Sequence, residues 1–219
     1  MRIKIAIATN KNFSNLTLPI VIPSLLDVGI NKDDIFVFNA GFDKEDEVVI
    51  DGITHYYLNH NSYEYSPLIH ICEKELSSDY WFLLHDTCKV GPKFKELLYN
   101  IDGLPDKLAL KDKPSMSMGS YKYTYLLSVK EKLYGIKNTD YSDESMNKWK
   151  LWGVPNEDYI LWLTPPKAII YNDLNTYSIV KYENWYNTKT IRRTEYYPSL
   201  DIYKNKSNWG QNRNMVRSI

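Results

Sequence analysis

The sequence is poor in cysteine, with only Cys72 and Cys88 among its 219 residues. Two cysteines cannot form a disulfide framework, and no pair has the Cys-x-x-Cys spacing of a metal or redox site. We therefore expect a reducing compartment and a cytoplasmic protein. There is also no excess charge of either sign, because basic and acidic residues both number 27. Without a positive excess, non-specific attraction to nucleic acid is weak, and we expect no nucleic-acid partner.

Long hydrophobic runs are absent. The apolar run near the N-terminus, Ile5 to Ala8, is shorter than the ~7–15 residues of a signal-peptide core, and nothing approaches the ~20 residues of a membrane span. Two motifs are missing as well: no Gly-x-Gly-x-x-Gly follows the first expected strand, and no Gly-x-Ser-x-Gly occurs. These absences disfavour a dehydrogenase and an α/β hydrolase. At 43% hydrophobic residues, the chain still has enough apolar side chains for a substantial core.

Apolar stretches alternate with amphipathic ones along the first two thirds of the chain. We expect strands at Arg2–Ala8, Asp34–Asn39, Glu47–Leu58, Tyr80–Leu84, Lys107–Leu110 and Lys167–Tyr171. We expect helices from Leu16 to Gly29, then at Tyr63–Leu76, Pro92–Leu98, Tyr121–Leu133, Asp143–Trp152 and Asp158–Leu163. This order predicts an α/β fold with a mixed, mostly parallel central sheet and helices on both faces. The most hydrophobic strand, Tyr80–Leu84, belongs at the centre of that sheet.

Polar or small residues follow three of the expected strands. The first strand ends in Ala8, Thr9 and Asn10, the second ends at Asn39, and the central strand ends at Asp86. If these strands are neighbours, the three turns meet on one edge of the sheet, where open α/β sheets bind their ligands. A nucleotide fits there, with Asp86 holding a divalent ion that screens the diphosphate. Asp86 also has a simpler interpretation as the cap of the following turn.

Three stretches of the chain, Ile22–Ile30, Asp79–Thr87 and Ser117–Tyr121, resemble nucleotide-sugar glycosyltransferases of the GT-A fold. In that family an Asp-x-Asp motif after the central strand binds a metal ion, Mn²⁺ or Mg²⁺, that is bound in turn to the nucleotide diphosphate. Asp86 matches one aspartate of the motif, whereas the partner position holds Leu84 or Cys88. The resemblance therefore implies a degenerate metal site at Asp86.

The loop expected at Met116–Ser120 resembles the segment of the family that lies between donor and acceptor. Gly119 lets the backbone approach a sugar closely, although it also fits an ordinary turn. Tyr121 presents an aromatic face with a hydroxyl tip that suits a sugar ring and equally suits a half-exposed helix.

An inverting glycosyltransferase needs a carboxylate that removes the proton of the acceptor hydroxyl. Glu157 and Asp158 resemble the Glu-Asp motif of the family, which implies that Asp158 is the base. Asp143 and Glu144 are the rival pair. Both pairs open expected helices, where acidic residues are stabilised by the helix dipole in any protein.

The C-terminal region is basic. From Lys181 onward there are eight basic and three acidic residues, so this region carries +5. We expect residues 1–180 to form the nucleotide-sugar-binding domain and residues 181–219 to pack on the donor site or close over it. Four residues of that segment would contact the donor diphosphate and sugar: Lys204, Lys206, Asn208 and Trp209. A disordered basic terminus is the alternative.

Together these features predict a glycosyltransferase that moves a sugar from a nucleotide-diphosphate donor to a hydroxyl of a glycan or another acceptor. One alternative is a carbohydrate-binding or scaffolding module without catalytic activity, favoured by the degenerate metal motif. Another is a sugar nucleotidyltransferase. Those enzymes bind a triphosphate with a glycine-rich loop, and residues Ala8–Asn12 contain no glycine.

Overall fold

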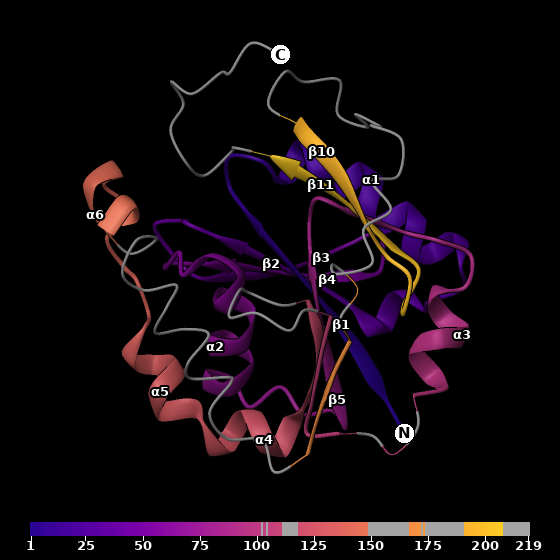
Figure 1. Ribbon diagram of the computed structural model, residues 1–219. Helices are drawn as coiled ribbons and strands as arrows, with labels where there is room; N and C mark the ends of the chain where they lie inside the picture. Colours follow the sequence, from indigo (N-terminus) through magenta and orange to yellow (C-terminus); the bar gives the residue numbers. More distant parts are fainter. Residues whose placement is uncertain are drawn as a thin grey trace.

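The structure is a computed structural model that describes residues 1–101, 103, 105–110, 118–148, 167–171, 173 and 191–207. Within these residues a large sheet has the strand order β3-β4-β2-β1-β5-β8-β7-β9 (Figure 1). Its strands are β1 (Ile3–Asn10), β2 (Ile35–Ala40), β3 (Asp46–Ile50), β4 (Ile53–Leu58), β5 (Tyr80–His85), β7 (Lys107–Ala109), β8 (Gly119–Lys122) and β9 (Ala168–Ile170).

The sheet is mixed. Strands β4, β2, β1 and β5 are parallel neighbours, and so are β7 and β9, whereas β3 and β8 pair antiparallel to their neighbours. Helices α1 (Ser14–Asp27) and α3 (Phe94–Tyr99) cover one face. The other face is covered by α2 (Ser66–Glu73), α4 (Tyr123–Ser128) and α5 (Lys130–Gly135) (Figure 1). The predicted α/β class, with a mostly parallel sheet between helices, is confirmed.

Strand β5 lies inside the large sheet, as its continuous apolar sequence predicted. All of its residues are buried, and their side chains alternate between the two cores, as the two-residue period of a strand requires. Phe82 and Leu84 pack with α1 and α3, whereas Trp81 and Leu83 pack with the helices of the other face. A strand covered on both faces has no polar side, which explains its continuous apolar sequence.

Several elements differ from the sequence prediction. Helix α1 begins at Ser14 rather than Leu16, so Pro19 lies inside the helix and not in its first turn. The stretch Glu47–Leu58 is a hairpin, β3 and β4, whose turn at Asp51 and Gly52 has positive φ at both residues. Aspartate followed by glycine is typical of such a tight hairpin turn.

The region around Gly119 is a strand and not the predicted loop and helix. Strand β8 lies between β5 and β7, and helix α4 begins only at Tyr123. A Cβ at position 119 would overlap the backbone carbonyl oxygen of Leu108 in β7. Glycine is therefore required here by strand packing, because the backbones approach too closely for a side chain.

A second sheet, absent from the sequence prediction, has the order β10-β11-β6 and consists of β10 (Ile191–Tyr197), β11 (Ile202–Ser207) and β6 (Cys88–Val90). Because β6 follows β5 almost directly, this sheet lies beside the carboxyl end of the central strand. The backbone N–H of Asn205 donates to the carbonyl oxygen of Thr87 at 2.9 Å. The remaining described elements are the short helices η1 (Lys32–Asp34), η2 (Tyr63–Tyr65) and α6 (Asp143–Lys148).

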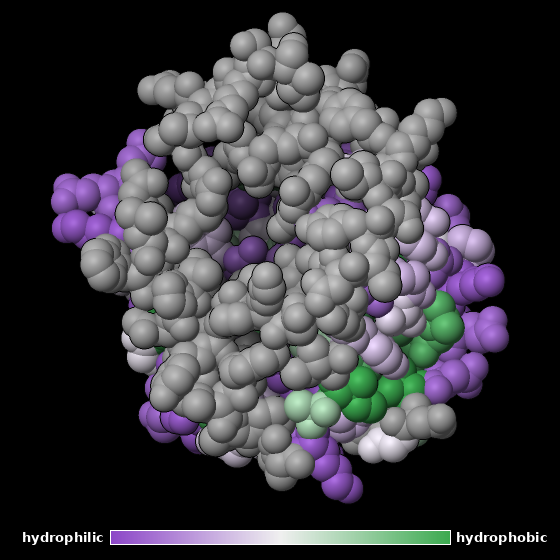
Figure 2. Space-filling view, viewed as in Figure 1, coloured by the Kyte–Doolittle hydropathy of each residue, from purple (hydrophilic) through white to green (hydrophobic). Residues whose placement is uncertain are grey.

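The described part of the surface in Figure 2 is mostly hydrophilic, with a hydrophobic area near α3. Among the described residues, no helix has both the length and the apolar character needed to cross a membrane.

Candidate functional site

The carboxyl ends of β1, β2 and β5 meet at one edge of the large sheet, as the sequence predicted. Thr9 pairs with Asn39 across β1 and β2, and Ala8 pairs with His85 across β1 and β5. The backbone N–H of Asp86 donates to the carbonyl oxygen of Ala8 at 3.1 Å. We call the group formed by Thr9, Thr17, Asn39, Glu64, His85, Asp86 and Lys204 the rim cluster.

Asp86 is anchored through one oxygen of its carboxylate. Its Oδ2 accepts hydrogen bonds from the hydroxyls of Thr9, at 2.7 Å, and Thr17 of α1, at 3.0 Å. Burial raises the pKa of Asp86 to about 6, while the two hydroxyls and the positive charge of Lys204 act in the opposite direction. The carboxylate is therefore held in a fixed orientation and is mostly ionised at neutral pH.

Lys204 brings a positive charge to this edge from the second sheet. Strand β11 pairs with β6 so that Lys204 lies opposite Cys88, and its side chain is only 7% exposed. The Nζ of Lys204 forms a hydrogen bond with Nδ1 of His85, and Glu64 Oε1 lies 4.0 Å from His85 Nε2. A buried ammonium is costly unless anions or acceptors surround it, and here His85 and Asp86 lie beside it.

Asn39 and Asn10 differ in what their side chains do. The Oδ1 of Asn10 accepts a hydrogen bond from the backbone N–H of Asn12 at 3.0 Å, so this side chain forms a turn. Asn39 is 4% exposed, and its Oδ1 has no hydrogen-bond partner in the part of the chain that the structure describes. A buried amide oxygen without a partner is destabilising, and a donor group of a bound ligand would satisfy it.

Other predicted site residues lie elsewhere. Gly119 starts β8 opposite Leu83, and the backbone that approaches it closely belongs to β7 rather than to a sugar. Tyr121 is fully buried in the core beneath α2 and α4, so the prediction that it contacts a sugar is replaced by a packing role. Glu144, of the rival pair with Asp143, forms an exposed ion pair with Lys148 at 3.0 Å on α6.

Four predicted residues, Glu157, Asp158, Asn208 and Trp209, lie outside the described residues. The backbone of Lys206 lies in β11, two residues after Lys204. Thr17 and Glu64 could not be singled out from the sequence, because a threonine inside a helix and a glutamate in a short turn have no distinctive spacing. Their roles appear only when the chain is folded.

The donor atoms around Asp86 do not fit a metal ion that the protein holds by itself. The neighbouring motif positions Leu84 and Cys88 are fully buried in the core, and Oδ2 of Asp86 is already bonded to two hydroxyls. The positive charge of Lys204 already acts on Asp86 and disfavours a second cation beside it. Hard cations prefer several oxygen ligands, and Asp86 alone does not supply them.

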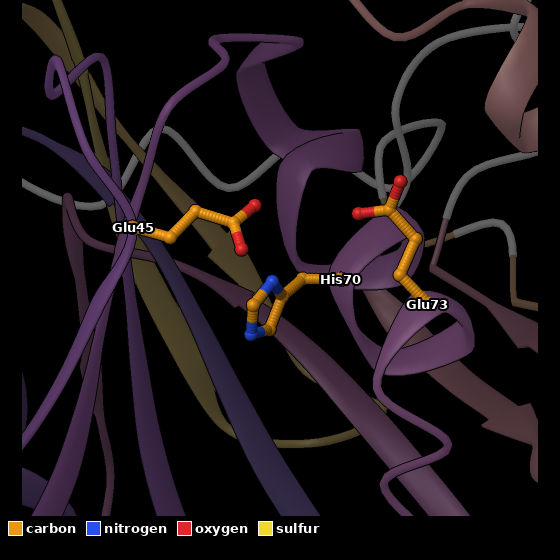
Figure 3. Close-up of side chains that lie close together, drawn as sticks. All are labelled: Glu45, His70 and Glu73. Atoms are coloured by element: carbon orange, nitrogen blue, oxygen red, sulfur yellow. The ribbon is translucent and has the colours of Figure 1, made fainter.

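Side chains of metal-ligand type do come together at another place, Glu45, His70 and Glu73 (Figure 3). They lie on the α2 side of the sheet. The sequence prediction placed helix Tyr63–Leu76 there but did not single out these residues, since Glu45 is distant in the sequence.

Comparisons with known proteins give fold likenesses only. No family model matches the sequence, and no curated protein matches it. A structure of S. aureus TarS, residues 1–349, is similar with a TM-score of 0.47 and 11% identity over 78% of this chain. The present chain spans 58% of the length of that structure. A glycosyltransferase involved in the glycosylation of the major capsid of PBCV-1 is similar with a TM-score of 0.36 and 12% identity, covering 77% of this chain and 82% of that one.

Proposed function

We propose that the protein is a glycosyltransferase that moves a sugar from a nucleotide-diphosphate donor to a hydroxyl of a glycan or another acceptor. The observation that carries this proposal is the rim cluster, where a buried ammonium and an anchored carboxylate meet at the carboxyl ends of three neighbouring strands. Ligands of open α/β sheets bind at this edge, and a diphosphate needs a cation there.

In this proposal Lys204 binds the donor diphosphate. When the bond between the anomeric carbon and the phosphate oxygen breaks, negative charge builds up on the leaving nucleoside diphosphate, and the ammonium stabilises it. His85 is a positioning residue, because its hydrogen bond with Lys204 holds the ammonium in place. Asp86 and Asn39 accept hydrogen bonds from hydroxyl or amide groups of the donor.

The base of the reaction is proposed from the sequence alone. Asp158, with Glu157 beside it, removes the proton of the acceptor hydroxyl as that oxygen forms its bond to the anomeric carbon. The proton then resides on Asp158, and the nucleoside diphosphate leaves with the electron pair of the broken bond. In the same proposal, residues 1–180 form the donor-binding domain and residues 181–219 pack on it. Lys206, Asn208 and Trp209 of that segment would cover the donor.

The melting temperature of the full chain tests donor binding. We expect one nucleoside diphosphate or nucleotide sugar from a panel, with or without Mn²⁺ or Mg²⁺, to raise it, because a ligand that binds only the native state stabilises that state. Lys204→Gln should abolish the shift. Lys89→Gln is the matched control, since Lys89 is an exposed lysine on the adjacent strand β6. No shift with any nucleotide in a folded sample contradicts the proposal.

A transfer assay with the selected donor separates the alternatives. Release of the nucleoside diphosphate that depends on an acceptor supports the transferase. Carbohydrate binding without release in the wild type indicates a binding module. Release of pyrophosphate from a nucleoside triphosphate and a sugar phosphate indicates a nucleotidyltransferase.

A further inference from the structure

The strongest feature outside the rim cluster is the group formed by Glu45, His70 and Glu73, which we call the α2 cluster. His70 and Glu73 come from helix α2, and Glu45 comes from the loop between β2 and β3. One ligand atom from each residue lies within 4.8 Å of those from the other two. Figure 3 shows the imidazole of His70 extending from helix α2 toward the loop that carries Glu45, with the Glu45 carboxylate extending toward the ring.

His70 is the unusual member of this cluster. Its side chain is 2% exposed, and neither ring nitrogen has a hydrogen-bond partner in the described part of the structure. The ring packs against Tyr56, with centroids 4.7 Å apart, and meets Phe38 edge-on at 5.9 Å. These contacts fix the ring but satisfy neither nitrogen, and a buried polar group without a partner is destabilising. The imidazole thus points to a ligand that accepts its lone pair.

Each of the two carboxylates is paired with one lysine, and both oxygens of Glu73 accept hydrogen bonds from Lys137. Glu45 Oε2 lies 3.0 Å from Lys74 Nζ, and Lys137 Nζ lies 2.8 Å from Glu73 Oε1. A carboxylate offers about four lone-pair sites, so it can keep a lysine and bind a cation at the same time. Both lysines have long flexible side chains that are partly exposed, Lys74 to 50% and Lys137 to 23%. A cation that enters the cluster therefore competes with groups that can move.

We propose that Glu45, His70 and Glu73 bind a divalent transition-metal ion of the zinc type. One imidazole nitrogen and two carboxylate oxygens supply three ligands, and water completes a tetrahedral shell. Imidazole favours Zn²⁺ over the hard cations Mg²⁺ and Ca²⁺. The bound metal ties the loop after β2 to helix α2. Because this loop begins directly after Asn39 and Ala40, the metal fixes the chain that leaves the rim cluster.

Calorimetric titration of the chelator-treated full chain with Zn²⁺ tests the proposal. We expect one equivalent to bind and the melting temperature to rise. Glu45→Gln and Glu73→Gln should each weaken binding by at least about 10-fold, since even the loss of a group that only hydrogen-bonds to a metal ligand has an effect of about this size. Both glutamates are partly exposed, so these variants keep the core intact. Glu47→Gln, an exposed neighbour on β3, is the control and should bind as the wild type does.

The Asp86→Asn variant separates this site from the rim cluster. If Asp86→Asn binds Zn²⁺ as the wild type does, the ion is not at the rim, as we expect. Loss of binding in Asp86→Asn with unchanged binding in Glu45→Gln and Glu73→Gln overturns the proposal, and so does the absence of saturable Zn²⁺ binding in the wild type. The donor-binding test above does not use the α2 cluster, so either proposal can fail without the other.

Discussion

The rim cluster and the α2 cluster are built from similar residues but arranged in opposite ways. Each contains a buried histidine among charged side chains. At the rim, the ammonium of Lys204 is itself buried and bonds to His85, so the cation is part of the protein. In the α2 cluster, Lys74 and Lys137 bind only the carboxylates, and His70 has no partner among the described groups. A site with its own central cation suits an anionic ligand, whereas one without it suits a metal ion.

Removing the ammonium of Lys204 should abolish the difference between the two clusters, and we expect it to have the largest effect, a loss of turnover. With the donor identified, Lys204→Gln should lower turnover about 100-fold, because a group that stabilises charge in the transition state is lost. Its Zn²⁺ affinity should not change. The measurement is the initial rate of nucleoside diphosphate release, with Lys89→Gln as control. Equal rates for the two variants would contradict the role given to Lys204.

Neutralising the rim carboxylate should have a pH-dependent effect on stability. The pKa of Asp86 is about 6 in the folded protein against 3.8 for an aspartate in water, because burial disfavours the charged form, so protonation of Asp86 favours the folded state. Its contribution to stability is fully present below about pH 4 and is lost as the pH rises to about 6. The change in unfolding free energy for Asp86→Asn should therefore be more favourable at about pH 7.5 than at about pH 4, by roughly 1–3 kcal/mol.

Urea unfolding at both pH values measures this difference. Asp33→Asn, which removes an exposed carboxylate on η1, is the control. If the effect of Asp86→Asn on the unfolding free energy does not vary with pH, the pKa of Asp86 is not raised in the folded protein.

Removing one anchor of Asp86 tests how firmly the rim is organised. Thr17→Val keeps the shape of the side chain and deletes the hydroxyl that bonds to Oδ2. We expect a loss of about 1.5–3 kcal/mol in unfolding free energy at neutral pH, the range for a hydrogen bond to a charged group. The loss should be smaller at about pH 4, where Asp86 is neutral. Thr124→Val on α4, an exposed threonine, should stay within about 0.5 kcal/mol of the wild type.

The smallest effect should come from the lysines paired with the carboxylates of the α2 cluster. Lys137→Gln frees the carboxylate of Glu73 from its ion pair and should tighten Zn²⁺ binding about 3-fold, a modest gain typical of a partly exposed pair. Lys132→Gln on α5 is the exposed control. Weaker binding in Lys137→Gln would show that this lysine supports the site rather than competes for it.

The edge where β1, β2 and β5 end was predictable from the sequence. Each strand is a short apolar run that ends in polar or small residues, and parallel neighbours bring their carboxyl ends together. Thr9, Asn39 and Asp86 therefore followed from their positions alone. What could not be predicted is which atoms meet, because the bond from Thr17 depends on how α1 packs over the sheet.

The second sheet escaped prediction because its strands lack an apolar alternation. Strand β10 contains Arg192, Arg193, Thr194 and Glu195, which read as a solvated segment, and β11 is equally polar. The contact of β11 with β6 gives these residues their structure. Tyr121 was predicted in a helix for a related reason. The short stretch around it fits a strand and a helix equally well, and only its pairing with β5 and β7 makes it a strand.

The hydrogen bond between Lys204 and His85 joins residues 119 positions apart in the chain. During synthesis, the large sheet can acquire β1, β2, β4 and β5 long before β11 has emerged, since these strands are complete by His85. Among the described elements the rim cluster is thus completed late, and nascent chains that have already formed these four strands still lack its ammonium group. The order in which the chain is made keeps the proposed donor site incomplete until the fold around it exists.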